Sequence, residues 1–223
     1  LGYHIDKYPL DLEPWKKVIR KIKNPISKVT IGVVGKYTNL KDSYKSLNEA
    51  LIHGGISNSA SVDIHWINSE ELDTNKILKE LQKVDGILIP GGFGYRGIEG
   101  KIKAIKYARE NNIPFFGICL GMQLAVIEIA RNVLKLEKAN STEFTETDNP
   151  VVGLMTEWHI EDKLEKRNIN SDKGGTMRLG AYKAILKKPS KIYKIYNKQE
   201  IEERHRHRYE VNNLYAKEFI KKG

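Results

Sequence analysis

The chain has 223 residues, of which 40% are hydrophobic and 30% charged, and its formal net charge is +10. This composition is typical of a soluble globular protein, and no apolar run approaches the roughly 20 residues of a membrane span. No signal-peptide pattern is visible at Leu1, and the single cysteine, Cys119, excludes internal disulfides and suits a reducing cytosol. The lysines are scattered without interleaved aromatic residues, so we expect a cytoplasmic protein with a solvated basic surface, no nucleic-acid partner and no membrane partner.

Residues 1–27 are predicted to be an appendage to the rest of the chain. Asp11-Leu12-Glu13-Pro14 is a helix start, with an Asp cap and a proline in the first turn. Asn24-Pro25 ends that helix. We expect a linker helix that packs on the neighbouring domain through apolar residues at helical spacing, namely Trp15, Val18, Ile19 and Ile22.

Residues 28–223 are predicted to form one domain that begins with alternating strands and helices. Buried strands are expected at 29–34, 62–67, 84–89 and 115–118, and helices at 43–53, around 77–81, at 98–111 and from 122 onward. This alternation indicates βαβ units with a parallel sheet flanked by helices. The predicted fold class is therefore α/β, flavodoxin-like, with a mostly parallel central sheet.

The pattern changes after Arg131. Strands are expected at 150–155 and 180–186, a polar surface loop or hairpin at 157–171 and a glycine turn at 174–176. Function in such sheets collects at the carboxyl ends of the strands. Two glycine-rich turns, after Ile89 and after Ile118, lie at such ends.

The second of these turns holds the only cysteine. Cys119 is flanked at two residues on each side by Gly117 and Gly121, between a short apolar strand and a helical pattern. This is the cysteine version of the G-x-S-x-G nucleophile elbow. The helix start is expected to favour the thiolate of Cys119 over the thiol. A lone cysteine is more often a small buried hydrophobe, but the two glycines favour a nucleophile here.

The first glycine-rich turn, P-G-G-F-G at 90–94, lets the backbone approach a ligand closely. Acyl transfer from an amide passes through a tetrahedral oxyanion, which needs two preorganised N–H donors. The elbow supplies one from Leu120, and we expect Gly92 to supply the other. Taken alone, this segment could be a plain tight turn.

The segment R-H-R-H-R-Y-E at 204–210 alternates two residue types. In a strand its three arginines share one face and its two histidines the other. A guanidinium fork suits a carboxylate. A solvated edge strand is one alternative. A metal pair at His205 and His207 is another, but no third ligand lies nearby in the sequence, and we expect no metal site.

Five motifs in this order resemble the glutaminase domain of CTP synthases, a class I, triad-type glutamine amidotransferase. The first two are shared broadly by amidotransferases and the last three are more specific; they are P-G-G-F-G-Y-R-G, G-I-C-L-G-M-Q, N-S-T-E-F, G-G-T-M-R-L-G and E-R-H-R-H-R-Y-E-V-N. The resemblance covers the whole chain. Residues 1–27 resemble the linker that follows the family's synthase domain, which is not among these residues.

The resemblance implies a role for each matching position. Cys119 would be the nucleophile, and Gly92 and Leu120 would hold the oxyanion. Glutamine would be bound by Gly92, Leu120, Gly121, Met122, Gln123, Glu143 and Arg208. Glu143 would pair with the α-amino group and Arg208 with the α-carboxylate.

The resemblance also implies partners. The substrate would be L-glutamine, and its ammonia would aminate UTP in pyrimidine nucleotide biosynthesis. This domain would need no cofactor, whereas ATP and Mg²⁺ would belong to the synthase domain of the same polypeptide. GTP would be the activator and the whole enzyme a homo-tetramer.

One part of the family pattern is missing from the 223 residues. The family completes its triad with a His-Pro-Glu motif, and none of the six histidines here is followed by Pro-Glu. We therefore expect the domain at 28–223 to lack its carboxyl-terminal end. Two alternatives stay open: a glutamine-binding regulatory module without turnover, and a stand-alone cysteine hydrolase of γ-glutamyl substrates. The G-G-T-M-R-L-G and R-H-R-H-R-Y-E motifs argue against the hydrolase.

Overall fold

The computed structural model describes residues 11–36, 41–70, 74–154, 157–160, 163–166 and 177–222. The appendage before Asp11 and the glycine turn predicted at 174–176 lie outside these residues. The described residues divide into two compact units. One contains the residues up to Pro90 together with Arg96–Phe116, and the other contains Gly91–Tyr95 and the residues from Gly117 onward.

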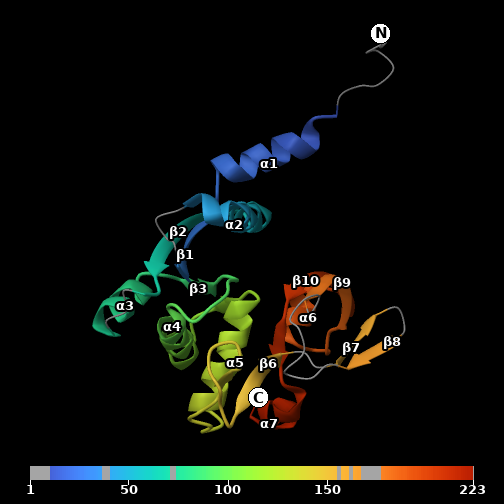
Figure 1. Ribbon diagram of the computed structural model, residues 1–223. Coiled ribbons are helices and arrows are strands. Elements are labelled where there is room, and N and C mark those ends of the chain that lie inside the picture. Colours follow the sequence, from blue (N-terminus) through green and yellow to red (C-terminus); the bar gives the residue numbers. More distant parts are fainter. Residues whose placement is uncertain are drawn as a thin grey trace. The chain divides into compact units, whose positions relative to one another are not determined.

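The first unit contains the predicted parallel sheet (Figure 1). Its strands occupy the sheet in the order β2-β1-β3-β4, and β1 pairs in parallel with both β2 and β3. The bounds are β1 Ser27–Gly35, β2 Ala60–Asn68, β3 Gly86–Ile89 and β4 Phe115–Gly117. This is the strand order of a flavodoxin-type sheet, so the predicted α/β class is confirmed. Every residue of β3 is buried, as expected of a strand covered on both faces.

Helices follow the strands of the first unit: α2 Lys45–Ser57, α3 Thr74–Leu81 and α4 Ile98–Glu110, with a 3₁₀ turn at Lys41–Tyr44 before α2. Helix α2 packs on β2, and α4 packs on β1 and β3. The buried side of α4 carries the apolar residues at helical spacing that the sequence predicted, Ile102, Ile105 and Ala108.

The predicted linker helix is present as α1, Glu13–Lys23, with a proline in its first turn. The residue that caps this helix is Leu12 and not the predicted Asp11, although the carboxylate of Asp11 accepts a hydrogen bond from the N–H of Glu13 at 3.0 Å. The prediction that its apolar residues pack on the neighbouring domain is wrong for three of the four. The exposed fractions are 69% for Trp15, 48% for Ile19 and 51% for Ile22. The spacing of the apolar residues predicted the helix correctly. An amphipathic pattern does not identify the surface, if any, that covers the apolar face of the helix.

The second unit is built around α5, Leu120–Asn132. This helix packs on a three-stranded sheet of order β11-β6-β5, whose strands are β5 Asn140–Ser141, β6 Pro150–Leu154 and β11 Tyr209–Val211. Side chains of α5 and β6 form the apolar core between them, including Leu124, Ile127, Ala130, Val151 and Val152. The core fixes the start of α5, where Cys119 lies.

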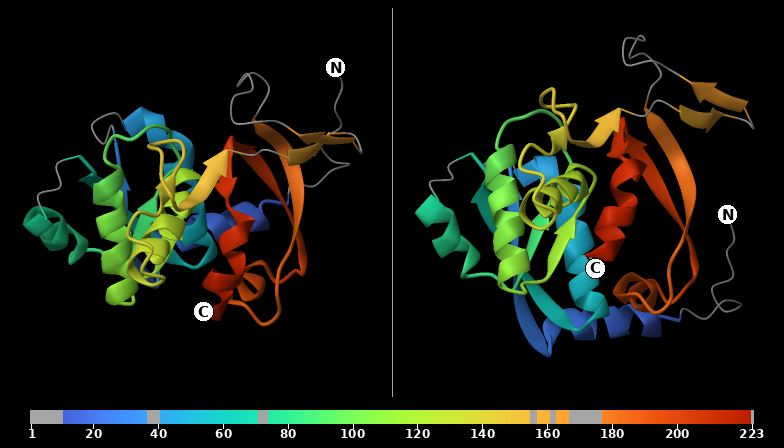
Figure 2. Two further views of the ribbon diagram at one scale, coloured as in Figure 1. Left: turned by 60° about the horizontal axis from the view of Figure 1, so that its bottom comes forward. Right: turned by 90° about the horizontal axis from the view of Figure 1, so that it is seen from below.

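A separate two-stranded sheet in this unit contains most of the arginine–histidine segment (Figure 2). Strand β10, Glu200–His207, pairs antiparallel with β9, Arg178–Ile185. Helix α6, Lys191–Tyr196, lies between them in the sequence, and a 3₁₀ turn at Asn213–Tyr215 and helix α7, Ala216–Lys221, follow β11. Strands β7 Glu157–Ile160 and β8 Lys163–Lys166 pair as a hairpin in the predicted loop-or-hairpin segment.

Among the described residues, no helix has the length and apolar character needed to cross a membrane.

Candidate active site

Cys119 lies at the point where β4 turns into α5. It precedes the first residue of the helix and has φ 52° and ψ −104°, a left-handed φ that is uncommon for a residue with a side chain. An ideal Cβ on Gly117 would lie 2.5 Å from the carbonyl carbon of Gly121, so strand and helix pass too closely for a side chain there. The glycine spacing around Cys119 thus has the steric origin that an elbow requires.

The glycine-rich loop that follows β3 lies against this elbow. An ideal Cβ on Gly91 would be 3.5 Å from the Cβ of Cys119, and one on Gly92 would be 3.6 Å from Cδ2 of Leu120. Both are ordinary contact distances. The structure therefore brings together the two turns that the sequence placed at neighbouring strand ends, with Gly92 beside Leu120.

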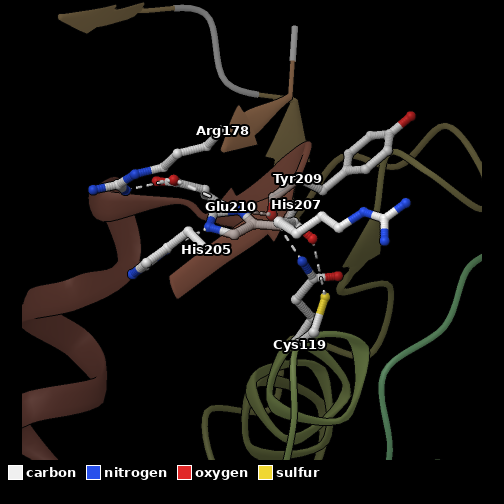
Figure 3. Close-up of polar contacts among 8 residues, drawn as sticks. Cys119, Arg178, His205, His207, Tyr209 and Glu210 are labelled. Carbon is white, nitrogen blue, oxygen red and sulfur yellow. Dashed lines mark hydrogen bonds and ion pairs between the residues drawn. The ribbon is translucent and has the colours of Figure 1, made fainter. Parts of the chain in front are cut away.

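The sulfur of Cys119 points from the start of α5 towards the segment that joins β10 and β11 (Figure 3). Its thiol donates a hydrogen bond to the carbonyl oxygen of Arg206 at 4.0 Å. Burial raises the pKa of Cys119 and the charge of Glu143 raises it further, while the N–H of Leu120 lowers it in part. The direction of this shift is opposite to the expected preference for the thiolate, because burial outweighs the helix start.

Two predicted glutamine ligands make specific contacts in this unit. The carboxylate of Glu143 accepts a hydrogen bond from the N–H of Gly94 at 2.9 Å. Gln123 is buried, and its amide Nε2 donates to the carbonyl oxygen of Tyr209 at 2.8 Å. Gln123 thereby ties α5 to the residue that follows Arg208. Among the other predicted ligands, Leu120 and Gly121 are buried, Gly92 is half-buried and Met122 is 44% exposed.

The alternation predicted for the arginine–histidine segment holds only as far as His207. Arg204 and Arg206 are exposed, whereas His205 and His207 are half-buried on the opposite face of β10. Arg208 is not part of that strand. The chain bends there, because β10 pairs with β9 whereas β11 pairs with β6. The prediction that three arginines share one face is thus wrong for Arg208.

Arg208 is half-buried, and its Nε is a buried donor without a hydrogen-bond partner among the described residues. A buried N–H without an acceptor is costly, so such a group points to a ligand that completes it. Both Arg208 and Glu143 act on the hydroxyl of Tyr209. Burial raises the pKa of that phenol, Glu143 raises it further and Arg208 lowers it. A carboxylate and a guanidinium therefore lie within electrostatic reach of one tyrosine.

The two histidines of β10 contact each other. Nδ1 of His205 lies 2.7 Å from Nε2 of His207, and Nδ1 of His207 lies 3.2 Å from the carbonyl oxygen of Tyr209. Because a carbonyl can only accept, the hydrogen of a neutral His207 belongs on Nδ1, and His205 must then donate from its own Nδ1. Burial lowers the pKa of His205, and the charges of Arg178 and His207 add to that effect.

A cavity of about 400 Å³ adjoins the sulfur. Of the predicted site residues, Cys119, Met122 and Gln123 line it, whereas Gly92, Leu120, Gly121, Glu143 and Arg208 do not. The wall of the cavity also includes three residues that were not predicted as site residues, Arg178, Tyr209 and Glu210. Arg178 donates to Glu210 at 2.7 Å (Figure 3). All three lie within motifs that carried the family resemblance, which was the available signal.

The described residues contain no group of three or more His, Cys, Asp or Glu arranged to hold a metal ion.

The fold and the elbow define a class: α/β proteins that present a nucleophilic side chain at a strand-to-helix turn beside a glycine loop. The family model described as "Glutamine amidotransferase class-I" matches residues 39–223. The chain belongs to the class-I glutamine amidotransferase family.

Within this family, the chain is similar to CTP synthases. The chain is 56% identical over 212 residues to a CTP synthase of Methylorubrum populi, covering 95% of this chain and 39% of that protein. It is 59% identical over 204 residues to a CTP synthase of Agrobacterium fabrum, covering 92% of this chain and 38% of that protein. The chain thus spans about two fifths of the length of the curated relatives it matches.

A solved structure of another CTP synthase domain is also similar to this chain. The glutaminase domain of the Trypanosoma brucei CTP synthase, with bound acivicin, superposes with a TM-score of 0.76 at 42% identity. The match covers 87% of this chain and 72% of that one.

Proposed function

We propose that this chain is the glutaminase part of a CTP synthase and that Cys119 attacks the side-chain amide of glutamine. The observation that carries the proposal is the elbow itself. Cys119 has a left-handed φ at the start of α5, and the glycine loop lies so near that a Cβ added at Gly91 or Gly92 would contact Cys119 or Leu120, respectively. The relatives supply the substrate class, since they are CTP synthases, and one solved relative is a glutaminase domain.

The reaction begins when Cys119 Sγ loses its thiol proton to a general base and forms a bond to the amide carbon, so that the carbonyl becomes an oxyanion. The N–H of Leu120 is directed at the sulfur, and the N–H of Gly92 is our second donor for that oxyanion. Collapse of this intermediate breaks the carbon–nitrogen bond and releases ammonia after proton transfer to nitrogen. Water then hydrolyses the thioester to glutamate and regenerates the thiol.

Proton transfer in these steps needs a positioned acid and base. His205 and His207 bond to each other and to the Tyr209 carbonyl, so we expect neither to serve. The family resemblance assigns this work to a His-Pro-Glu segment, which the 223 residues do not contain. Among the described residues, the one acceptor to which Sγ donates is the backbone carbonyl of Arg206, and a carbonyl cannot take a proton at neutral pH.

That observation favours a second candidate for the 223 residues taken alone: a glutamine-binding module without turnover. In the whole protein the ammonia would aminate UTP in a synthase domain of the same polypeptide, which would use ATP and Mg²⁺, with GTP as activator and a homo-tetrameric assembly. This would take place in the reducing cytosol, which suits a protein with one free cysteine.

Arg208 provides a test of glutamine recognition, because its buried Nε has no hydrogen-bond partner among the described residues. A hydrogen bond between charged groups contributes about 1.5–3 kcal/mol, so Arg208→Ala should weaken glutamine binding roughly 10- to 150-fold. Arg204 is exposed on β10, and Arg204→Ala should change the affinity less than about 2-fold. Calorimetric titration with glutamine measures both.

The matched ligand control is 4-aminobutanamide, which keeps the amide but lacks the α-carboxylate. Its binding should be equally weak in the parent protein and in Arg208→Ala. Equal losses of glutamine affinity in the two arginine variants, or an Arg208 effect that persists with 4-aminobutanamide, would contradict the assignment of Arg208 to the α-carboxylate.

A further inference from the structure

The carboxylate of Glu143 joins two parts of the site that the proposed function treats separately. Its Oε1 accepts the N–H of Gly94 at 2.9 Å. Gly94 is the last residue of the glycine loop and has φ +77°, a conformation that strongly favours glycine. The same loop lies beside the elbow, since a Cβ added at Gly91 would contact Cys119 and one added at Gly92 would contact Leu120. Glu143 therefore holds the far end of the loop that carries the second oxyanion donor.

The backbone around Glu143 is itself fixed. The N–H of Glu143 donates to Oγ of Ser141 at 3.2 Å, and Ser141 is fully buried. The N–H of Ser141 donates in turn to Oδ1 of Asn140, and the N–H of Thr142 to the carbonyl of Val152 in β6. The carboxylate thus projects from an anchored turn, so its position can determine that of the loop end and not the reverse.

The charge of Glu143 has no cationic partner within the described part of the chain. No Lys, Arg or His there lies within ion-pair distance of its oxygens. The negative charge of Glu143 nevertheless acts on Cys119, because it raises the pKa of that thiol. An arriving ammonium group would neutralise it. The carboxylate also has a second oxygen, Oε2, for such a group while Oε1 keeps the Gly94 N–H.

We propose that Glu143 is a positioning residue for the oxyanion loop as well as a ligand for the substrate ammonium, so that one carboxylate couples substrate recognition to the assembly of the nucleophilic site. This proposal rests on the proposed function for the identity of the ammonium group. Its loop-holding part is independent of the substrate. An amide that lacks the α-ammonium group would leave Glu143 charged and Cys119 protonated, so the site discriminates against it twice.

Two substitutions separate the hydrogen bond from the charge. Glu143→Gln keeps an oxygen that can accept the Gly94 N–H but removes the negative charge, whereas Glu143→Ala removes both. Glu146 is an exposed carboxylate in the same segment, and Glu146→Ala is the matched control. The variants are made in the 223-residue protein, and two properties are measured without substrate: hydrogen exchange of the Gly94 amide by NMR, and the rate of Cys119 alkylation by iodoacetamide as a function of pH.

In Glu143→Ala the Gly94 amide should exchange about 10-fold faster or more, while in Glu143→Gln it should stay near the parent rate. The pH midpoint of Cys119 alkylation should fall in both variants, because both remove the charge. Glu146→Ala should change neither property. Calorimetry should show that both Glu143 variants lose glutamine affinity.

Gly94 exchange that is unchanged in Glu143→Ala, or an alkylation midpoint that is unchanged in both variants, would overturn the proposal. Because the Gln variant keeps the loop contact, a normal folded spectrum for that variant guards against misfolding as the cause. If the parent protein fails to bind glutamine while Gly94 and Cys119 respond as expected, the proposed function fails and the loop-holding role stands.

Discussion

Gly117→Ala is expected to destabilise the protein by about 3 kcal/mol or more and to abolish covalent labelling of Cys119 by a glutamine analogue. A Cβ at this position would lie 2.5 Å from the carbonyl carbon and 2.6 Å from the oxygen of Gly121, and these are backbone atoms of α5. Backbone cannot rotate away as a flexible side chain can, so the strand end and the helix start must separate, at the upper end of the cost of overpacking. Urea denaturation measures the stability.

Gly54 is the matched control, because it lies in an open position where alanine is expected to stabilise the protein. Gly54 lies within α2, and a Cβ there would meet nothing within 4 Å. Gly54→Ala should stabilise the protein by about 0.5–1 kcal/mol, as alanine does in a helix interior. A Gly117→Ala protein that is as stable as Gly54→Ala and still reacts at Cys119 would show that the elbow does not need its close approach.

Lys101→Met is expected to stabilise the first unit by about 2–3 kcal/mol at pH 7. The side chain of Lys101 on α4 is 2% exposed, and burial, helped by the charge of Lys36, lowers its pKa from 10.5 to about 8. A depression of this size corresponds to about 3 kcal/mol for keeping the ammonium buried. Methionine has a similar length and no charge, and it offsets part of the gain only through imperfect packing.

The pH dependence gives a sharper test of the same residue. Between about pH 8 and 10.5 the unfolded chain still binds the Lys101 proton while the folded chain has released it. The free energy of unfolding of the parent protein should therefore rise, relative to Lys101→Met, across this window, and the difference should be constant below it. Lys103→Met, on the exposed side of the same helix, should follow the parent protein. A constant difference across the whole window would contradict a buried, depressed Lys101.

The regular elements of this chain could be predicted from short-range patterns. The apolar runs at 29–34, 62–67 and 84–89 predicted β1, β2 and β3, and the helical spacing of apolar residues predicted α4. The predicted burial is complete only in β3, whereas most residues of β2 are half-buried. The elbow at Cys119 was equally predictable, because the close approach of Gly117 to the backbone of Gly121 is a local steric requirement. The environment of Arg208 could not be predicted from local patterns. Its departure from β10 follows from the pairing of β11 with β6, a contact between segments far apart in sequence.

The electrostatic environment of Cys119 also could not be predicted from the residues next to it in the sequence. A helix start favours a thiolate, but the burial of Cys119 and the charge of Glu143 act in the opposite direction and dominate. Neither effect can be deduced from the order of residues around the cysteine. The contact between Glu143 and Gly94 joins residues 49 positions apart, and the resemblance alone would have left Glu143 as a substrate ligand.

The most direct test of Cys119 as the glutaminase nucleophile is covalent labelling by a glutamine analogue that carries an electrophile at the position of the side-chain amide; acivicin, which the Trypanosoma brucei domain holds, is the first choice. Intact-mass spectrometry and peptide mapping should find one adduct, on Cys119, with none in Cys119→Ser. Glutamine should protect against labelling, and Arg208→Ala should slow it. A folded protein in which Cys119 stays unmodified, or in which another residue carries the adduct, would contradict the account.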